Sequence, residues 1–178
     1  MPGDAASTAA DFLWLFGIGQ DDPVTFQCFD DGQKKRRHLA RVIHTPLASC
    51  ADQLAALNAM GAGVFWTVSA CDGVGRRLEN YRHARAVWVD VDRPGLDWLD
   101  GQPEPTAVVR TAAGHHAYWR LSDGADVDAA ALTSLCRRAA AACGGDAAST
   151  DAVRVMRLPG YRLQRNCVKH GVMLHFCV

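Results

Sequence analysis

The stretch "RAVWVDVDRPG", residues 85–95, contains an apolar run that ends in two aspartates spaced two residues apart. The run predicts a buried strand over residues 87–91, and side chains two apart on a strand share a face. Asp90 and Asp92 should therefore project side by side, together with Trp88. Two neighbouring carboxylates repel unless something neutralises them, and Mg²⁺ or Mn²⁺ prefers such oxygen ligands. The motif therefore suggests a metal site, although two solvated aspartates at a strand end fit the same residues.

The composition is that of a soluble globular domain. The chain has 178 residues, and its 19 basic and 19 acidic side chains give a net charge of zero. Most nucleic-acid-binding domains have a basic excess, so any contact with a polyanion must come from local basic patches. No apolar run is long enough to cross a membrane, and the N-terminus does not resemble a signal peptide. Seven cysteines without paired spacing indicate reduced thiols and a cytoplasmic protein.

The order of predicted elements indicates an α+β or mixed α/β fold with a largely antiparallel sheet, in one domain over residues 1–178. We expect the first ten residues to be disordered. The predicted helices cover residues 11–16, 50–60 and 126–142. The predicted strands cover residues 24–29, 39–43, 64–68, 87–91, 107–110, 117–121 and 172–178, and the first two should form a hairpin.

A histidine motif, "GHHAYWRL" at residues 114–121, starts another strand after a glycine-containing turn. His116 should share a face with Tyr118, whereas His115 points to the other face. A single histidine is more often structural than catalytic. If this strand lies beside the strand with the aspartates, however, His116 and Asp92 meet at one sheet edge where a ligand could dock.

The segment "GGDAASTDAVRVMRLPG", residues 144–160, combines acidic and basic side chains after a helix stop. Ser149 or Thr150 could cap a short helix. Arg154 and Arg157 are three residues apart and would face the same way on a helical turn. They are either solvated arginines or a clamp for phosphates. Arg76, in the loop "DGVGRRLEN" at residues 72–80, is a weaker candidate for a phosphate contact.

The order of these motifs resembles the archaeo-eukaryotic primase superfamily, and within it the plasmid- and phage-type replication primases and primase-polymerases. The resembling segments cover most of residues 23–165. The resemblance implies an RRM-like, largely antiparallel sheet packed with helices and an N-terminal α/β module. It also implies two divalent ions, Mg²⁺ or Mn²⁺, bound by Asp90, Asp92 and a third aspartate, for which Asp146 is preferred over Asp151. By the same resemblance, the nucleotide or phosphate contacts are His116, Arg154, Arg157, Arg76 and Arg165.

The implied function is a DNA primase or primase-polymerase, a nucleotidyltransferase that acts in plasmid or phage DNA replication. Its partners would be a single-stranded DNA template, nucleoside triphosphates (NTP or dNTP) and a replicative helicase, with no membrane. One alternative is a non-catalytic module that binds nucleic acid through a degenerate primase fold. A second alternative is a rolling-circle initiator nuclease, in which Tyr81 or Tyr161 would be the nucleophile.

Overall fold

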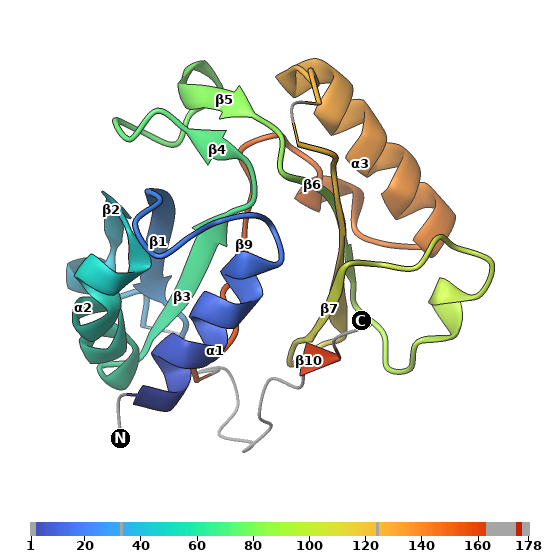
Figure 1. Cartoon of the computed structure of the whole chain (residues 1–178). Coiled ribbons are helices and arrows are strands. Elements are labelled where there is room, and N and C mark those ends of the chain that lie inside the picture. Colours follow the sequence, from blue (N-terminus) through green and yellow to red (C-terminus); the bar gives the residue numbers. More distant parts are fainter. Residues whose placement is uncertain (1–2, 33, 124, 163–173, 176–178) are drawn as a thin grey trace.

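The computed structural model describes residues 3–32, 34–123, 125–162 and 174–175. Within them the chain forms two four-stranded sheets, a two-stranded ribbon and three α-helices (Figure 1). The strands are β1 (Val24–Asp30), β2 (Arg41–Thr45), β3 (Ala62–Thr67), β4 (Ala70–Cys71), β5 (Tyr81–His83), β6 (Ala86–Val91), β7 (Ala107–Arg110), β8 (His115–Arg120), β9 (Val155–Arg157) and β10 (Leu174–His175).

Both large sheets are antiparallel throughout. The first has the strand order β2-β1-β3-β9, and the second has the order β10-β7-β8-β6. Every neighbouring pair in these sheets is antiparallel, as is the β4-β5 ribbon. The predicted mixed fold with an antiparallel sheet is therefore confirmed, and so is the predicted hairpin of the first two strands.

The helices are α1 (Gly3–Trp14), α2 (Leu47–Ala59) and α3 (Ala129–Cys143). The α3 helix begins where the Asp128 carboxylate accepts a 2.7 Å hydrogen bond from the Ala131 amide, and it ends at Gly144 in a left-handed conformation. In Figure 1, α3 lies beside β6, on the far side of the molecule from α2. Short 3-10 turns cover Arg37–Leu39, Leu78–Asn80, Asp97–Leu99 and Ala147–Ser149.

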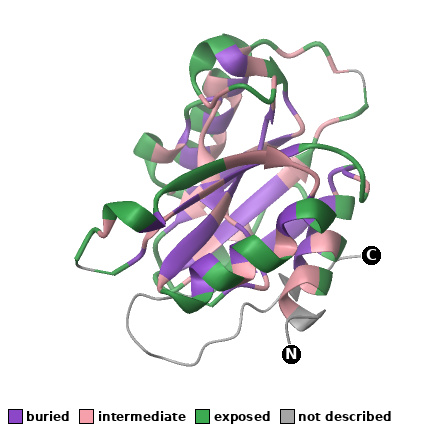
Figure 2. Ribbon diagram, turned by 90° about the vertical axis from the view of Figure 1, so that its left-hand side faces the viewer, coloured by how far each residue is buried: buried purple, intermediate pink, exposed green. Residues whose placement is uncertain are grey.

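An aromatic cluster joins the two large sheets. The ring of Phe12, on α1, lies 5.3 Å from the ring of Trp66 on β3 and 5.5 Å from that of Tyr118 on β8. All three side chains are fully buried, and burying an apolar side chain contributes roughly 1.5–3 kcal/mol. The α1 helix therefore packs between the sheets. Figure 2 shows the same division, with buried residues on the inner strands and exposed ones on outer helix faces and loops.

Most predicted boundaries differ from the observed ones by a few residues, and two predictions were clearly wrong. Residues 3–10, predicted to be disordered, are helical, because α1 starts at Gly3 and buries Ala9 and Phe12 in the core. The second strand begins at Arg41 rather than Leu39, which ends a 3-10 turn and is fully buried. Of the predicted last strand, only residues 174 and 175 are described. None of the described helices combines the length and apolarity that a bilayer-spanning segment needs.

Candidate active site

Strands β6 and β8 are neighbours, and their register places Asp90 opposite His116. The Nε2 atom of His116 lies 3.4 Å from Oδ1 of Asp90. On the other side of the imidazole, Nδ1 lies 3.4 Å from the hydroxyl of the buried Tyr118. The ring of His116 is thus held between a carboxylate and a core hydroxyl. His115 points to the other face and lies near Trp98.

Gly114 lets the turn before His116 approach β6 closely. A Cβ atom at position 114 would lie 1.9 Å from the Val91 carbonyl oxygen and 2.6 Å from the Arg93 amide nitrogen. The turn itself is closed by the Gly114 amide, which donates a 3.0 Å hydrogen bond to the Thr111 hydroxyl. Glycine is therefore required at position 114, because any side chain there would collide with the backbone after β6. This accounts for the glycine of the "GHH" motif.

Asp146 is brought to β6 by a second close backbone approach. The Asp146 amide donates a 2.7 Å hydrogen bond to the carbonyl of Asp90, and a Cβ atom at Gly145 would lie 2.8 Å from that same carbonyl oxygen. Asp146, 56 positions after Asp90 in the chain, is thereby fixed beside it. The Asp146 carboxylate also accepts a 2.8 Å hydrogen bond from the Ala148 amide, so Asp146 rather than Ser149 caps the short turn.

Ser149 connects the two carboxylates. Its hydroxyl lies 3.0 Å from Oδ2 of Asp146 and 3.4 Å from Oδ2 of Asp90. The indole N–H of the buried Trp88 donates a 2.8 Å hydrogen bond to the Ser149 carbonyl and so anchors this turn to the core. Asp90, Asp146 and Ser149 therefore form one hydrogen-bonded group at the edge of the second sheet.

Asp90 is held in its ionised form. Its side chain is 22% exposed, and burial alone would raise its pKa. Hydrogen bonds from His116 and Ser149, with electrostatic attraction to His116 and Arg154, outweigh this and hold the pKa of Asp90 below its ordinary value. An ionised carboxylate at neutral pH is a hard oxygen ligand, suited to Mg²⁺ or Mn²⁺.

Asp92 follows the last residue of β6 and is exposed. Its side chain has no hydrogen-bond or ion-pair partner among the described residues. Within the described ranges, no three His, Cys, Asp or Glu side chains lie close enough together to hold a metal ion. The oxygen donors of Asp90 and Asp146, both bonded to Ser149, suit a hard cation in chemistry, and Asp92 is an exposed carboxylate two positions after Asp90.

Arg154 and Arg157 are separated by the structure. The prediction that they face the same way on a helical turn was wrong, because Arg157 is the last residue of strand β9 and Arg154 precedes that strand. Arg154 lies within electrostatic range of Asp90. Its Nε atom is 2.9 Å from a carboxylate oxygen of the exposed Asp151, but the N–H does not point at that oxygen, so Nε lacks a hydrogen-bond partner among the described atoms.

Arg157 is instead part of the packing of the first sheet. Both of its terminal nitrogens donate to the buried Asp31, over 3.0 and 3.1 Å. Its guanidinium also lies 4.6 Å from the centre of the Phe65 ring, which stacks on Phe29. With its nitrogens committed to Asp31, Arg157 is placed as a structural residue rather than as a free phosphate contact.

The other predicted site residues make no described contact with Asp90 or lie outside the described residues. Arg76 donates a 2.9 Å hydrogen bond to the Val153 carbonyl, beside Arg154. Asp151, the alternative third ligand, pairs with Arg154 and has no hydrogen bond to Asp90 among the described contacts. This geometry favours Asp146 over Asp151. Arg165 lies outside the described residues.

The two candidate tyrosine nucleophiles of the nuclease alternative are unsuited to that role by their surroundings. The Tyr81 hydroxyl donates to the Val127 carbonyl, and burial raises the pKa of Tyr81 to about 12. Tyr161 is 4% exposed, and burial also raises its pKa. A nucleophilic tyrosine needs access and an easily lost proton, so neither residue suits the nuclease alternative.

Sequence reasoning missed the positioning roles of Ser149, Trp88 and Tyr118. Ser149 was considered only as a possible helix cap. Its spacing of three residues from Asp146 is the local signal, because aspartate and serine side chains often hydrogen-bond over that distance in turns. The contacts of Trp88 and Tyr118 depend on strand pairing and on the fold around residue 149, and no local pattern predicts them.

Comparison with protein families places the chain in a described family. The family model described as "RepB DNA-primase N-terminal domain" matches residues 38–171, about three quarters of the chain. No curated protein matches the sequence. The family match includes all the residues of the Asp90 site.

Solved structures with the same fold carry related descriptions. The primase-polymerase domain of cyanophage S-2L superimposes with a TM-score of 0.74 at 22% identity, over 95% of this chain and 88% of that one. The catalytic domain of primase RepB′, solved with initiator DNA, gives a TM-score of 0.69 at 20% identity, over 96% of this chain and 84% of that one. A longer RepB′ structure gives a TM-score of 0.69 at 20% identity, and the match covers 98% of this chain and 56% of that one. These likenesses establish the fold.

Proposed function

Because the chain belongs to the RepB DNA-primase N-terminal domain family, we propose that it is a nucleotidyltransferase that makes or extends primers on a single-stranded DNA template. Its setting would be the replication of a plasmid or phage. A phage primase-polymerase and a primase solved with initiator DNA share its fold. The observation that carries the proposal is the ionised Asp90, held between His116 and Ser149, with Asp146 bonded to the same strand.

In the proposed reaction, the 3′-hydroxyl of a bound nucleotide or primer attacks the α-phosphate of an incoming nucleoside triphosphate. A new P–O bond forms, the hydroxyl proton passes to solvent water, the bond between the α-phosphate and the bridging oxygen breaks, and pyrophosphate leaves. Asp90, Asp92 and Asp146 would hold divalent cations. When bound, Mg²⁺ or Mn²⁺ would stabilise charge on the phosphoryl oxygens and lower the pKa of the attacking hydroxyl.

The remaining side chains would position phosphates. His116 has one nitrogen directed at Asp90 and the other at Tyr118, so its ring is oriented before substrate binds. To contact the phosphates of the incoming nucleotide, its Nε2 would exchange the Asp90 carboxylate for a phosphate oxygen. Arg154 brings positive charge to Asp90 and would neutralise charge that develops on the triphosphate. Ser149 would keep the two carboxylates in a fixed relative position.

Removal of divalent ions tests the proposed reaction. We expect the chain to synthesise primers on single-stranded DNA with Mn²⁺ or Mg²⁺, and to lose this activity in excess EDTA, because unneutralised carboxylates repel the triphosphate. Activity is measured from labelled nucleotide incorporated, and readdition of Mn²⁺ should restore it. Incorporation that survives EDTA would contradict the proposal.

Ser149→Ala tests the bridge between the carboxylates. We expect primer synthesis to fall by about 10-fold to 100-fold, since loss of a group that orients metal ligands typically has such an effect. The measurement is kcat/KM for nucleotide at several Mn²⁺ concentrations. The matched control is Ser134→Ala, at an exposed position on α3, which should leave both activity and Mn²⁺ dependence unchanged. Equal kinetics in the two variants would argue against a role for Ser149.

A second candidate function is nucleic-acid binding without catalysis. It is favoured by the finding that no three potential metal ligands converge within the described residues. The EDTA experiment separates the two functions, because a non-catalytic module would bind single-stranded DNA equally with and without divalent ions and would incorporate no nucleotide.

A further inference from the structure

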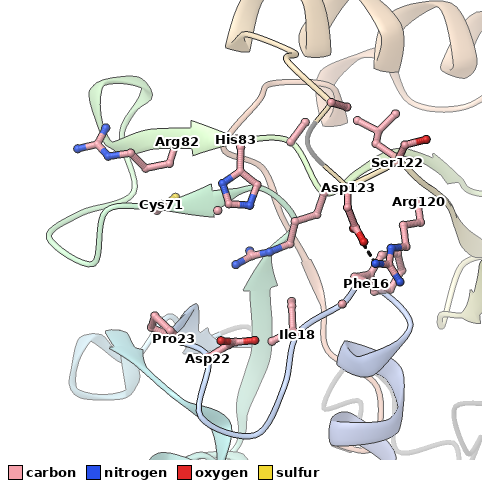
Figure 3. Close-up of a pocket in the computed structure, with 16 residues that line it drawn as sticks. Phe16, Ile18, Asp22, Pro23, Cys71, Arg82, His83, Arg120, Ser122 and Asp123 are labelled. Carbon is pink, nitrogen blue, oxygen red and sulfur yellow. Dashed lines mark hydrogen bonds and ion pairs between the residues drawn. The ribbon is translucent and has the colours of Figure 1, made fainter.

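A pocket of about 660 Å³ opens at the ends of β6 and β8 that lie opposite the candidate active site. This volume is within the range of small-molecule sites, roughly 300–1,000 Å³. Figure 3 shows it between the β4-β5 ribbon, the turn after α1 and the end of β8. Its basic lining residues are Arg82, His83, Arg85 and Arg120. The pocket lies at the Ala86–Arg120 end of the two strands, whereas Asp90 and His116 pair near the other end.

Two of the pocket's three arginines are already paired. Arg82 contacts Asp72 at 3.0 Å and donates to two backbone carbonyls. Arg120 contacts Asp123 at 2.7 Å, and Figure 3 draws this pair at the rim of the pocket. These pairs neutralise the charge that the two arginines bring.

Arg85 differs from both. Its side chain has no hydrogen bond or ion pair to any described residue, although it is only partly accessible to solvent. Burial lowers the pKa of Arg85, and Cys71 and Asp22 act in the opposite direction. One oxygen of Asp22 accepts a 2.8 Å hydrogen bond from the Gly19 amide. A guanidinium held this way is poised for an anion that supplies the missing acceptors.

We propose that this pocket is a phosphate-binding site, separate from the catalytic centre, in which Arg85 is the main ligand. A guanidinium suits phosphate because its planar fork can donate two parallel hydrogen bonds to two phosphate oxygens. His83 lines the same space and can add a ring N–H donor. The exposed Ser122 and the Cys71 thiol complete its rim.

The distance to the catalytic carboxylates excludes one source of the phosphate. Arg85 precedes Asp90 by five residues on an extended segment, which corresponds to about 17 Å. This is the separation of the two Cα atoms, and the odd spacing also sends the two side chains to opposite faces of the strand, so a triphosphate whose α-phosphate lies at Asp90 does not reach Arg85. The phosphate therefore comes either from a backbone position elsewhere on a bound DNA strand or from a second, free nucleotide. The choice between DNA and a free nucleotide rests on the proposed function, whereas the inference that the pocket binds phosphate does not.

The test is binding of inorganic pyrophosphate to the full chain in EDTA, measured by isothermal titration calorimetry. EDTA removes metal-mediated phosphate binding at the catalytic centre. We expect Arg85→Gln to weaken pyrophosphate binding by about 10-fold, the effect of losing a charge-assisted hydrogen bond. Arg138→Gln, at an exposed position on α3, is the matched control and should bind as the wild type does. Arg85→Lys keeps the positive charge but lacks the planar guanidinium, so its affinity for pyrophosphate should lie between those of the wild type and Arg85→Gln.

A second variant keeps the test valid if Arg85→Gln does not fold. Ser122 is exposed at the rim, so Ser122→Asp should fold normally and weaken pyrophosphate binding by placing a like charge near it. Ser134→Asp on α3 controls for the added charge. Equal pyrophosphate affinity in the wild type, Ser122→Asp and any folded Arg85 variant would overturn the proposal.

Two further titrations identify the source of the phosphate. The first titration uses an unphosphorylated 12-nucleotide single strand. If Arg85→Gln weakens its binding and reduces the slope of log affinity against log salt concentration by about 1, the site holds backbone phosphate. If it weakens dATP binding and leaves the single strand unaffected, the site holds a free nucleotide. A chain that binds pyrophosphate through Arg85 but synthesises no primer would overturn the proposed function and leave this inference standing. If the chain synthesises primers but its pyrophosphate binding does not depend on Arg85, this inference is overturned and the proposed function stands.

Discussion

Asp90→Asn is expected to reduce primer synthesis by on the order of 10³-fold, with the fold retained. Asparagine has nearly the same shape as aspartate and can still bond to Ser149 and His116. What it removes is the negative charge that would hold the divalent cation. Metal ions contribute several kcal/mol to the stabilisation of a phosphoryl-transfer transition state, and about 4 kcal/mol corresponds to a 10³-fold change in rate.

The measurement is the rate of nucleotide incorporation at saturating Mn²⁺ and template, with thermal unfolding of the same preparations. Asp52→Asn is the matched control, because Asp52 is exposed on α2, far along the chain from the site. We expect Asp52→Asn to keep wild-type activity and Asp90→Asn to keep a wild-type unfolding profile. An Asp90→Asn variant with more than a tenth of wild-type activity would remove Asp90 from the catalytic role.

Arg157→Met is expected to destabilise the protein by about 3 kcal/mol, because it takes the guanidinium away from a carboxylate that is 1% exposed. Breaking a buried ion pair by removing one partner typically costs 3–5 kcal/mol. The contact with the Phe65 ring is also lost. For a domain of this size, the melting temperature should fall by about 6–12 °C.

A double-mutant cycle with Asp31→Asn measures the coupling between the two residues. Since both single changes disrupt one interaction, the double variant should be destabilised by clearly less than the sum of the two. The matched control is Arg154→Met. The pair of Arg154 with Asp151 is partly exposed, so its loss should cost less than about 1 kcal/mol.

The two arginines should therefore have opposite effects. Arg154→Met should lower primer synthesis while leaving the melting temperature nearly unchanged. Arg157→Met should mainly lower the melting temperature. If Arg157→Met keeps its melting temperature and loses phosphate binding, Arg157 belongs to the substrate site and its assignment as a packing residue is wrong.

The local structure around the candidate site could be predicted from the sequence. The period of two in "AVWVDVD" gives the strand and the shared face of Trp88 and Asp90, and the same period after Gly114 separates His116 from His115. Alanine-rich composition and the glycines at 144 and 145 give α3 and its end. These features depend on residues a few positions apart, whose propensities act in any context.

Local patterns failed where burial decided the outcome. Residues 3–10 contain mostly small side chains and show no clear apolar face, so they were expected to be disordered. They are helical because Phe12 inserts between Trp66 and Tyr118. Similarly, the spacing of Arg154 and Arg157 fits a helical turn, but the chain joins the edge of the first sheet there and becomes strand β9.

By itself, the sequence determined the antiparallel mixed fold, the strand that carries Asp90 and ends just before Asp92, and the glycine turn that leads to His116. Only the tertiary structure decided that Arg157 binds Asp31, 126 positions away, that Ser149 joins Asp90 to Asp146, and that Arg85 lines a pocket without a partner among the described residues. The physical reason is range. Propensity and periodicity act between near neighbours, whereas the pairing of a buried charge depends on which distant segments the hydrophobic core brings together.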